Sequence, residues 1–557
     1  MISRPLHMAL ALPWVFLYLA KSRAAWLSGM VMTVLGIAAC LYIVFNQSAL
    51  GDQYGYLQGP LQIALAVVLL LVTLDMARRA ISWPLPLVAL LALLYGLFGD
   101  QLPGEFGHPG IPLASFLGTL TIAEGGLWGS LTGVSVSVVA VFVIFGAVLN
   151  AGEAGQGFMN LAVALAGRQR GGAAKVSVLA SAFFGSISGS ASANVASTGA
   201  ITLPTMRKLG YPPAFAGAVE AVASSGGQIM PPLMGAGAFV MVELLGIPYV
   251  AIIQAALLPA ILYFIAVWLG VNAFATRYDL RPLAAQDRVS SREVLITGMF
   301  FALPFTILLE RMFNGGYTPQ FAAALAIIAG FLLLLFGVKL DFSLARFGQR
   351  LLNLTHSAGA QIATIAAIIL CASIVIGVLG QTGLGVKITS AILAWSGDQL
   401  WIALLLTALA CLILGMEVPT TAAYVICVSV AGPALQKLGL APLQAHLFVF
   451  WFALLSTITP PVCGAVFIAA GMVEENWLKV ANKAMALGIG LYLIPLAFIA
   501  NPSLIELAQQ PLWALAAAIK IGLALWGISF AIITRGQPLL RLGIGALSLC
   551  LMFFLGI

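Results

Sequence analysis

Four short stretches combine serine, threonine, glycine and proline inside otherwise apolar sequence. They are GSISGSASANVASTG at 185–199, SSGGQIMPP at 224–232, GMEVPTTAAY at 415–424 and LLSTITPPVCG at 454–464. Hydroxyls, and carbonyls that proline frees from helix hydrogen bonds, are hard oxygen ligands suited to Na⁺. The free amides at the start of a half-helix favour a carboxylate. These stretches therefore predict the binding of a small anion together with a cation.

Two of the stretches belong to a sequence repeat. The segment LPTMRKLGYPP…QIMPPLMGA matches GPALQKLGLAP…TITPPVCGA without a gap. Pro231–Pro232 aligns with Pro460–Pro461, and Gly235 aligns with Gly464, each pair 229 residues apart. A duplicated unit with Gly/Pro-interrupted segments at equivalent places indicates the midplane site of a transporter. The alternative is helix kinking and small-residue packing, which suits one such stretch better than four.

The composition requires that these stretches be held by membrane helices. Of 557 residues, 62% are hydrophobic and only 8% are charged, whereas a soluble domain is about 25% charged. The 25 basic residues exceed the 18 acidic ones. We interpret the excess as loop charges that orient the spans, with clusters such as 21–23, 78–79 and 277–292 on the cytoplasmic side. No basic run with interleaved aromatics predicts a nucleic-acid partner.

The cysteines and histidines offer no other chemistry. The six cysteines are isolated in apolar stretches and the four histidines are scattered, so neither set has metal-ligand spacing. A membrane-embedded enzyme would need a Ser/His/Asp set or paired carboxylates with a histidine, and no such motif is present. A channel is also disfavoured, because broken-helix repeats favour alternating access. We therefore expect a transporter and not an enzyme, without a cofactor other than its coupling ion.

At these residues the chain resembles a known family. The run GSISGSASANVASTGAITLPTMRKLGYPPAFAGAVEAVASSGGQIMPPLMGAGAF closely resembles the large membrane subunit of tripartite ATP-independent periplasmic (TRAP) transporters, in the branch served by TAXI-type binding proteins. GMEVPTTAAYV and AHLFVFWFALLSTITPPVCGA fit as well, and the likeness covers about residues 125–500. The resemblance implies the all-α fold of the ion-transporter superfamily, with inverted repeats, two re-entrant hairpins and an elevator motion.

The resemblance also implies a function and partners. The function is secondary active import of a small organic acid or amino acid across the bacterial inner membrane, driven by an ion gradient. The partner is a periplasmic TAXI-type substrate-binding protein, which delivers the substrate. The alternative is a stand-alone anion:cation symporter of the same superfamily. The expected segments are a small-subunit-like scaffold at 1–98, a linker with an interfacial helix at 99–130, a first transport repeat at 131–275 with a hairpin at 185–199, cytoplasmic loops and scaffold helices at 276–350, a second transport repeat at 351–500 with a hairpin at 410–430, and a two-helix extension at 501–557.

The resemblance places the site between two hairpin tips and two helix breaks. The first tip falls at 186–194 and faces the break at 224–232, and the second falls at 415–421 and faces the break at 456–461. The expected substrate contacts are Ser188, Ser190, Asn194, Gln228, Thr420, Thr421 and Thr457. The expected Na⁺ contacts are Ser186, Ser192, Ser225, Gly226, Gly227, Gly415, Ser456 and Thr459.

One position departs from the family pattern. The family usually has glycine at the second tip, as in GMGVPTT, where this chain has Glu417. Intramembrane carboxylates are functional by default, so Glu417 is a candidate for proton coupling, and so is Glu220 in the apolar run AGAVEAVA. The alternatives are an exposed tip residue for Glu417 and a structural hydrogen bond for Glu220. The coupling ion is therefore Na⁺ or H⁺.

Overall fold

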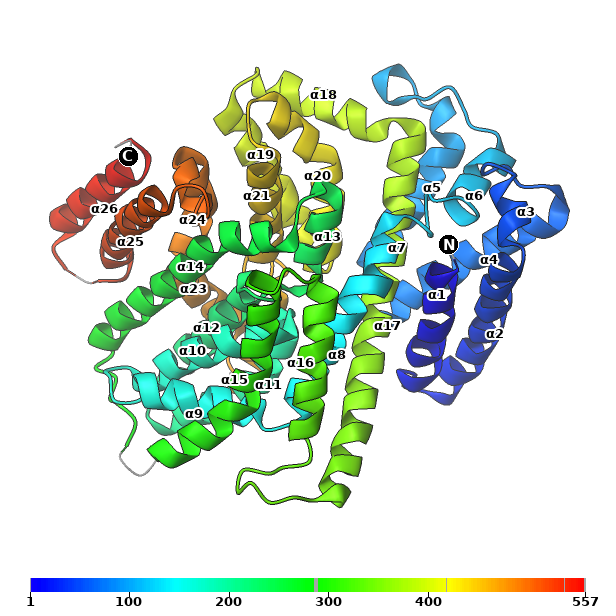
Figure 1. Ribbon diagram of the computed structural model, residues 1–557. Coiled ribbons are helices and arrows are strands. Elements are labelled where there is room, and N and C mark those ends of the chain that lie inside the picture. The colour runs from blue at the N-terminus through cyan, green and yellow to red at the C-terminus, as the bar shows by residue number, and fades with distance from the viewer. Residues whose placement is uncertain (1, 285–288, 417, 535, 555–557) are drawn as a thin grey trace. The chain divides into compact units, whose positions relative to one another are not determined.

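The apolar stretches of the sequence form helices throughout. The computed structural model describes residues 2–284, 289–416, 418–534 and 536–554. Among these residues the only strand-like pairing is one isolated bridge between Phe336 and Phe342 (Figure 1). Within the described ranges, nine helical stretches are long and apolar enough to cross a membrane. The predicted all-α polytopic membrane fold is confirmed.

The nine membrane-length stretches share high hydropathy and few charges. They are α2 (Arg23–Phe45), α4 (Gly59–Ala80), α5 (Pro84–Phe98) with its 3-10 extension (Gly99–Gln101), the run of α7 (Ser130–Val134), a π-turn (Ser135–Val139) and α8 (Ala140–Ala151), α14 (Tyr249–Arg277), α15 (Ser291–Phe313), α17 (Leu344–Thr382), α23 (Trp477–Leu487) with α24 (Ile489–Ala500), and α25 (Pro511–Ile533).

Local sequence signals set where these helices begin. The side chain of Ser22 accepts a hydrogen bond from the Ala25 amide at 3.2 Å and caps α2. Ser290 caps α15 in the same way. Proline opens α4, α5 and α25, where its missing amide is not needed. At the start of these helices, a serine side chain thus accepts from a backbone amide of the first turn, or a proline stands where an amide would have no partner.

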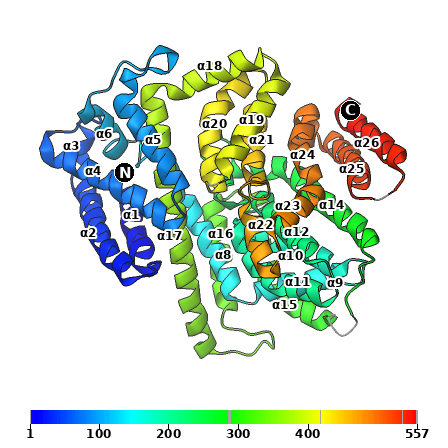
Figure 2. The same ribbon diagram turned by 180° about the vertical axis from the view of Figure 1, so that it is seen from behind.

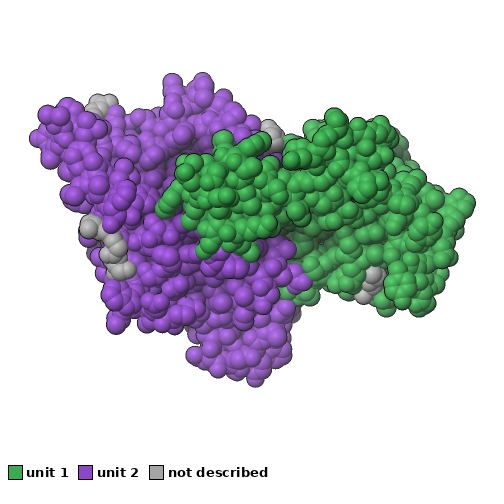
Figure 3. All heavy atoms as spheres, turned by 90° about the horizontal axis from the view of Figure 1, so that it is seen from above, with its two compact units in different colours: residues 1–144, 352–410, 417–439 green, residues 145–351, 411–416, 440–557 purple. Residues whose placement is uncertain are grey.

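The chain divides into two compact units, each assembled from segments that are distant in sequence (Figure 3). The first unit comprises 1–144, 352–410 and 417–439. Besides the spans above, it contains α1 (Ser3–Pro13), a π-helix (Trp14–Tyr18), α3 (Gln47–Gly51), a 3-10 turn (Gly104–Phe106), α6 (Leu113–Thr121), α18 (Leu384–Ser396), most of α19 (Leu400–Gly415) and α20 (Thr420–Lys437). Arg79 of α4 pairs with Asp75 and donates to the Ala25 carbonyl, which fastens α4 to α2.

The second unit comprises 145–351, 411–416 and 440–557. Its remaining helices are α9 (Ala154–Ala166), α10 (Gly172–Ser188), α11 (Ala191–Lys208), α12 (Pro213–Gly226), a 3-10 turn (Gly227–Ile229), α13 (Gly235–Leu245), α16 (Pro319–Leu333), α21 (Pro442–Leu455), α22 (Gly464–Val473), a 3-10 turn (Pro502–Ile505) and α26 (Pro538–Phe553). Helices α24, α25 and α26 pack side by side at the end of the chain (Figure 2). The segment boundaries expected from the sequence remain predictions.

Candidate functional site

The first polar stretch forms a helical hairpin in the second unit. Helix α10 ends at Ser188, and Gly189 follows it with a left-handed φ of 61°. Ser190 then caps α11 by accepting from the Ala193 amide at 3.3 Å. A Cβ on Gly189 would meet the Cα of Gly235 at 2.5 Å. Glycine is therefore required at the tip for two reasons, the turn and the close approach of a second backbone.

The second polar stretch interrupts a helix beside this hairpin. Helix α12 ends at Gly226, a 3-10 turn follows, and the Pro231–Pro232 peptide bond is cis. Gly185 and Gly227 touch backbone to backbone, and a Cβ on either would lie within the other residue. The hairpin and the break therefore pack backbone against backbone at these two glycines.

Asn194 connects the hairpin to the break. Its side chain is fully buried, and Nδ2 donates to the carbonyls of Ser181 at 3.0 Å and Ser224 at 3.2 Å. Its Oδ1 is buried without a partner among the described residues, and so is Oγ of Ser188. Leaving such an atom unpaired costs about 1–3 kcal/mol, so two unpaired oxygens at one tip indicate a ligand position.

The second break has the same plan. After α21, Oγ of Ser456 donates to the Gly415 carbonyl at 2.8 Å, and the Pro460–Pro461 peptide bond is cis. The amide of Ala465 in α22 donates to the Thr457 carbonyl at 3.1 Å. Thr457 Oγ1 lies 2.9 Å from Ser225 Oγ, so the two helix breaks meet at a pair of hydroxyls.

Glu220 is the centre of a buried polar cluster. Its side chain is 0% exposed, and five hydroxyls donate to its carboxyl group. These hydroxyls belong to Ser177 and Ser181 of α10, Thr198 and Thr202 of α11, and Ser224 of α12. Residues four apart share one helix face, so three helices direct polar faces at one carboxyl group. The cluster fastens the hairpin to α12.

Three tyrosines that the sequence did not single out complete the site. Tyr263 donates to the Val222 carbonyl at 2.6 Å, and Tyr249 donates to the carbonyl of Leu233 at 2.9 Å. The hydroxyl of Tyr492 lies 2.6 Å from Thr459 Oγ1. Carbonyls and hydroxyls near the breaks are thus held by phenols from α14 and α24. A lone tyrosine in an apolar helix is the only sequence signal for this role.

The other predicted residues differ in their surroundings. Ser186 Oγ donates to the Phe183 carbonyl at 2.7 Å, Gln228 is buried, and Ser192 is exposed. Thr420 and Thr421 begin α20 in the first compact unit, and Thr420 is buried. Glu417 lies outside the described residues. Within the described residues, no cluster of three His, Cys, Asp or Glu side chains suits a metal ion.

Comparison with known families covers most of the chain. The family described as tripartite ATP-independent periplasmic transporter, DctM component, matches residues 67–513. This range contains both tips and both breaks. The expected TRAP resemblance is therefore confirmed at the level of the large permease component.

Individual relatives have consistent names. The isethionate TRAP transporter permease protein DctMQ of Oleidesulfovibrio alaskensis is 26% identical over 422 residues, which cover 71% of this chain and 65% of the relative. The C4-dicarboxylate TRAP transporter large permease protein DctM of Pseudomonas aeruginosa is 27% identical over 339 residues, which cover 59% of this chain and 76% of the relative. The sialic acid TRAP transporter large permease protein SiaM of Vibrio cholerae is 22% identical over 403 residues, which cover 72% of this chain and 92% of the relative. These names agree with the prediction of a transporter and not an enzyme.

Proposed function

Because this chain belongs to the DctM component family of tripartite ATP-independent periplasmic transporters, we propose that it is the permease of an ion-driven importer of a small organic acid or amino acid. Nine membrane-length stretches among the described residues agree with a multi-pass protein of the bacterial inner membrane. The observation that carries the proposal is the meeting of two helix breaks at Ser225 and Thr457, 2.9 Å apart. Broken backbone is tolerated at membrane depth only where it is enclosed by protein or lines a cavity.

We propose that a cation binds at the first tip. The buried oxygens of Ser188 and Asn194 lack partners among the described residues, and oxygen atoms of this kind are hard ligands. The sequence assigned both residues to the substrate. We assign them to Na⁺ instead, because a bare amide oxygen repels a carboxylate. For a substrate carboxylate, the helix starts near Ser190 and Gly464 offer free amides, and Gln228 and Thr457 lie within the two helix breaks.

Proton coupling is the alternative, and the Glu220 cluster is its best support. Oγ1 of Thr198 contacts both Glu220 and the Asn194 carbonyl, and Oγ1 of Thr202 contacts both Glu220 and the Thr198 carbonyl. Each hydroxyl has one proton for two acceptors. Both can donate to an ionised carboxylate. When Glu220 is protonated, one of the two hydroxyls can accept its single proton and donate to the carbonyl instead. The cluster therefore accommodates both states of Glu220, and Glu417 remains a second candidate.

We further propose a TAXI-type binding protein as partner, a fused small subunit at 1–98, two re-entrant hairpins and an elevator motion. Similarity to a relative named DctMQ supports the fusion, and the glycine contacts between hairpin and break support their moving together. The alternative for the partner is a stand-alone symporter of the same superfamily.

Uptake by proteoliposomes tests these points. The full chain is reconstituted with and without its binding protein, and uptake of labelled succinate, glutamate and isethionate is measured under separate Na⁺ and H⁺ gradients. We expect uptake that requires the binding protein and follows the Na⁺ gradient. Full uptake without the binding protein supports the stand-alone symporter. Uptake driven only by the pH gradient, and lost in Glu220→Gln or Glu417→Gln, supports proton coupling. Chemical change of the solute overturns the transporter assignment.

A further inference from the structure

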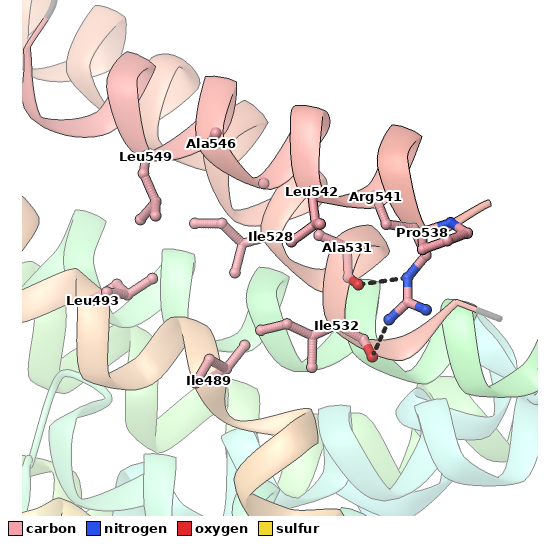
Figure 4. A pocket seen from close by; sticks show the side chains of 11 residues that line it. Ile489, Leu493, Ile528, Ala531, Ile532, Pro538, Arg541, Leu542, Ala546 and Leu549 are labelled. Atoms are coloured by element: carbon pink, nitrogen blue, oxygen red, sulfur yellow. Dashed lines mark hydrogen bonds between the residues drawn. The ribbon is translucent and has the colours of Figure 1, made fainter. Parts of the chain in front are cut away.

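A cavity far along the chain from the helix breaks lies among α24, α25 and α26. It has a volume of about 720 Å³, within the roughly 300–1,000 Å³ of ligand sites. Among the described residues its walls are aliphatic, and Arg541 is the one charged residue that lines it (Figure 4). The walls are formed by Ile489 and Leu493 of α24, Ile528, Ala531 and Ile532 of α25, and Pro538, Arg541, Leu542, Gly545, Ala546 and Leu549 of α26.

Exposed apolar side chains border the cavity. Leu542 and Leu549, which line it, are 71% and 42% exposed. On α25, Leu523 and Trp526 are both 57% exposed. Because these helices belong to a membrane-spanning chain and present apolar side chains on their outer faces, the molecules that can enter this groove are lipids.

The length of the groove matches one leaflet. Its lining on α26 runs from Pro538 to Leu549, which at about 1.5 Å per residue is about 16 Å. The hydrocarbon core of a bilayer is about 30 Å thick, so one leaflet supplies about half of that. A single acyl chain lying along α26 would therefore match the groove in length.

A cation stands at one end of the groove. Arg541 donates to the carbonyl of Ala531 at 2.8 Å and to that of Ile532 at 3.4 Å, beside Pro538 and away from Leu549 (Figure 4). These bonds use Nε and Nη2, and they fix the guanidinium at the C-terminal end of α25. The two carbonyls leave N–H donors on Nη1 and Nη2 unused, and guanidinium donors of this kind bind phosphate well.

Two further cations lie at the same end of α25. Arg277, at the end of α14, donates to the Ile533 carbonyl at 3.3 Å, and its Nε is buried without a partner among the described residues. Lys483 Nζ lies 5.6 Å from the ring centroid of Phe274, over which Arg277 also lies. None of the three forms an ion pair in the part of the chain that the structure describes. Arg277 begins the basic cluster assigned to the cytoplasmic side.

From this arrangement we propose that the α24–α26 groove is a binding site for an anionic phospholipid. One acyl chain lies along α26, and the phosphate meets Arg541, with Arg277 and Lys483 adding positive charge on the same side. Basic pockets between membrane helices on the cytoplasmic side bind anionic head groups in this way. The assignment does not depend on the transported solute or on the coupling ion.

Titration of the purified full chain with lipid tests the assignment by native mass spectrometry. We expect one POPG (an anionic lipid) to bind in preference to zwitterionic POPE. Arg541→Gln should weaken POPG about fivefold without affecting POPE, and Arg541→Lys should restore most of the affinity. Ala546→Phe should place a ring in the middle of the groove and obstruct the binding of either lipid there.

Matched controls separate this site from general lipid contact. Arg292→Gln removes an exposed cation elsewhere, and Leu547→Phe enlarges a side chain of α26 that is 68% exposed and outside the groove. Both should bind POPG like the unaltered chain. Equal affinity for POPG and POPE overturns the proposal. So does POPG binding that is unchanged in both Arg541→Gln and Ala546→Phe, or a copurified polypeptide displaced by Ala546→Phe.

Discussion

Replacing Ser188 with alanine should distinguish a cation ligand from a structural serine. Oγ of Ser188 is buried at the hairpin tip without a partner among the described residues. An unpaired buried polar group costs about 1–3 kcal/mol. In Na⁺-free buffer the substitution should therefore raise the free energy of unfolding by about 1 kcal/mol, whereas most buried substitutions lower it.

Saturating Na⁺ should cancel this gain. A ligand at 100 times its Kd stabilises the folded protein by about 2.7 kcal/mol. Loss of one oxygen ligand that weakens Na⁺ tenfold lowers this contribution to about 1.4 kcal/mol at the same concentration, because RT ln(1 + 10) replaces RT ln(1 + 100). The variant thus loses about 1.3 kcal/mol relative to the unaltered chain, which removes its advantage.

Thermal unfolding in detergent, in NaCl or choline chloride at equal ionic strength, measures the effect. The matched control is Ser373→Ala in α17, a buried serine whose Oγ donates to the Ile369 carbonyl at 2.8 Å. The control should lower the Tm in both salts and keep the Na⁺-dependent rise. If Ser188→Ala retains the full Na⁺-dependent rise in Tm, or is destabilised without Na⁺, the assignment of this oxygen to a cation is refuted.

Three other substitutions test the packing around the site. Glu220→Ala removes an acceptor shared by five hydroxyls, of which Thr198 and Thr202 keep a backbone carbonyl, and leaves a cavity; it should lower the free energy of unfolding by about 2–5 kcal/mol. Glu220→Gln should recover most of this loss, and equal Tm values for the two variants would contradict the cluster's role. Gly185→Ala forces a methyl group into Gly227 and should cost about 1–3 kcal/mol and abolish uptake, whereas Gly348→Ala, with open space around it, should be neutral or slightly stabilising. Arg350→Gln breaks the mostly buried ion pair with Glu153 and should lower the free energy of unfolding by about 3–5 kcal/mol. In a double-mutant cycle measured by denaturant unfolding, adding Glu153→Gln should make the total loss smaller than the sum of the two single losses.

The sequence predicted the class of the fold because hydropathy alone decides which segments enter a membrane. It located both helix breaks because proline pairs and glycines at a constant spacing report broken helices directly. It also contained an unused signal. Ser177 with Ser181, and Thr198 with Thr202, are four residues apart, and this spacing predicts polar faces on two helices before any contact is known.

Other parts of the site depend on tertiary packing and have no local signal. Ser186 and Ser188 lie two residues apart in the same polar stretch, and nothing in the sequence distinguishes them. Ser186 Oγ donates to a backbone carbonyl, whereas Ser188 Oγ has no partner among the described residues. The difference arises from the position of each residue on the last turn of α10. Tyr263 and Tyr492 reach the breaks from helices that follow much later in the chain. No spacing rule links residues brought together only by packing between helices.

The contact between Gly185 and Gly227 has a consequence for altering the transported solute. Where two backbones lie this close, no replacement side chain fits at either position. This part of the site therefore offers nothing that mutation can adjust. Attempts to redesign solute preference should begin at positions where a side chain already faces the breaks, such as Gln228 and Thr457, and leave the glycine joint untouched.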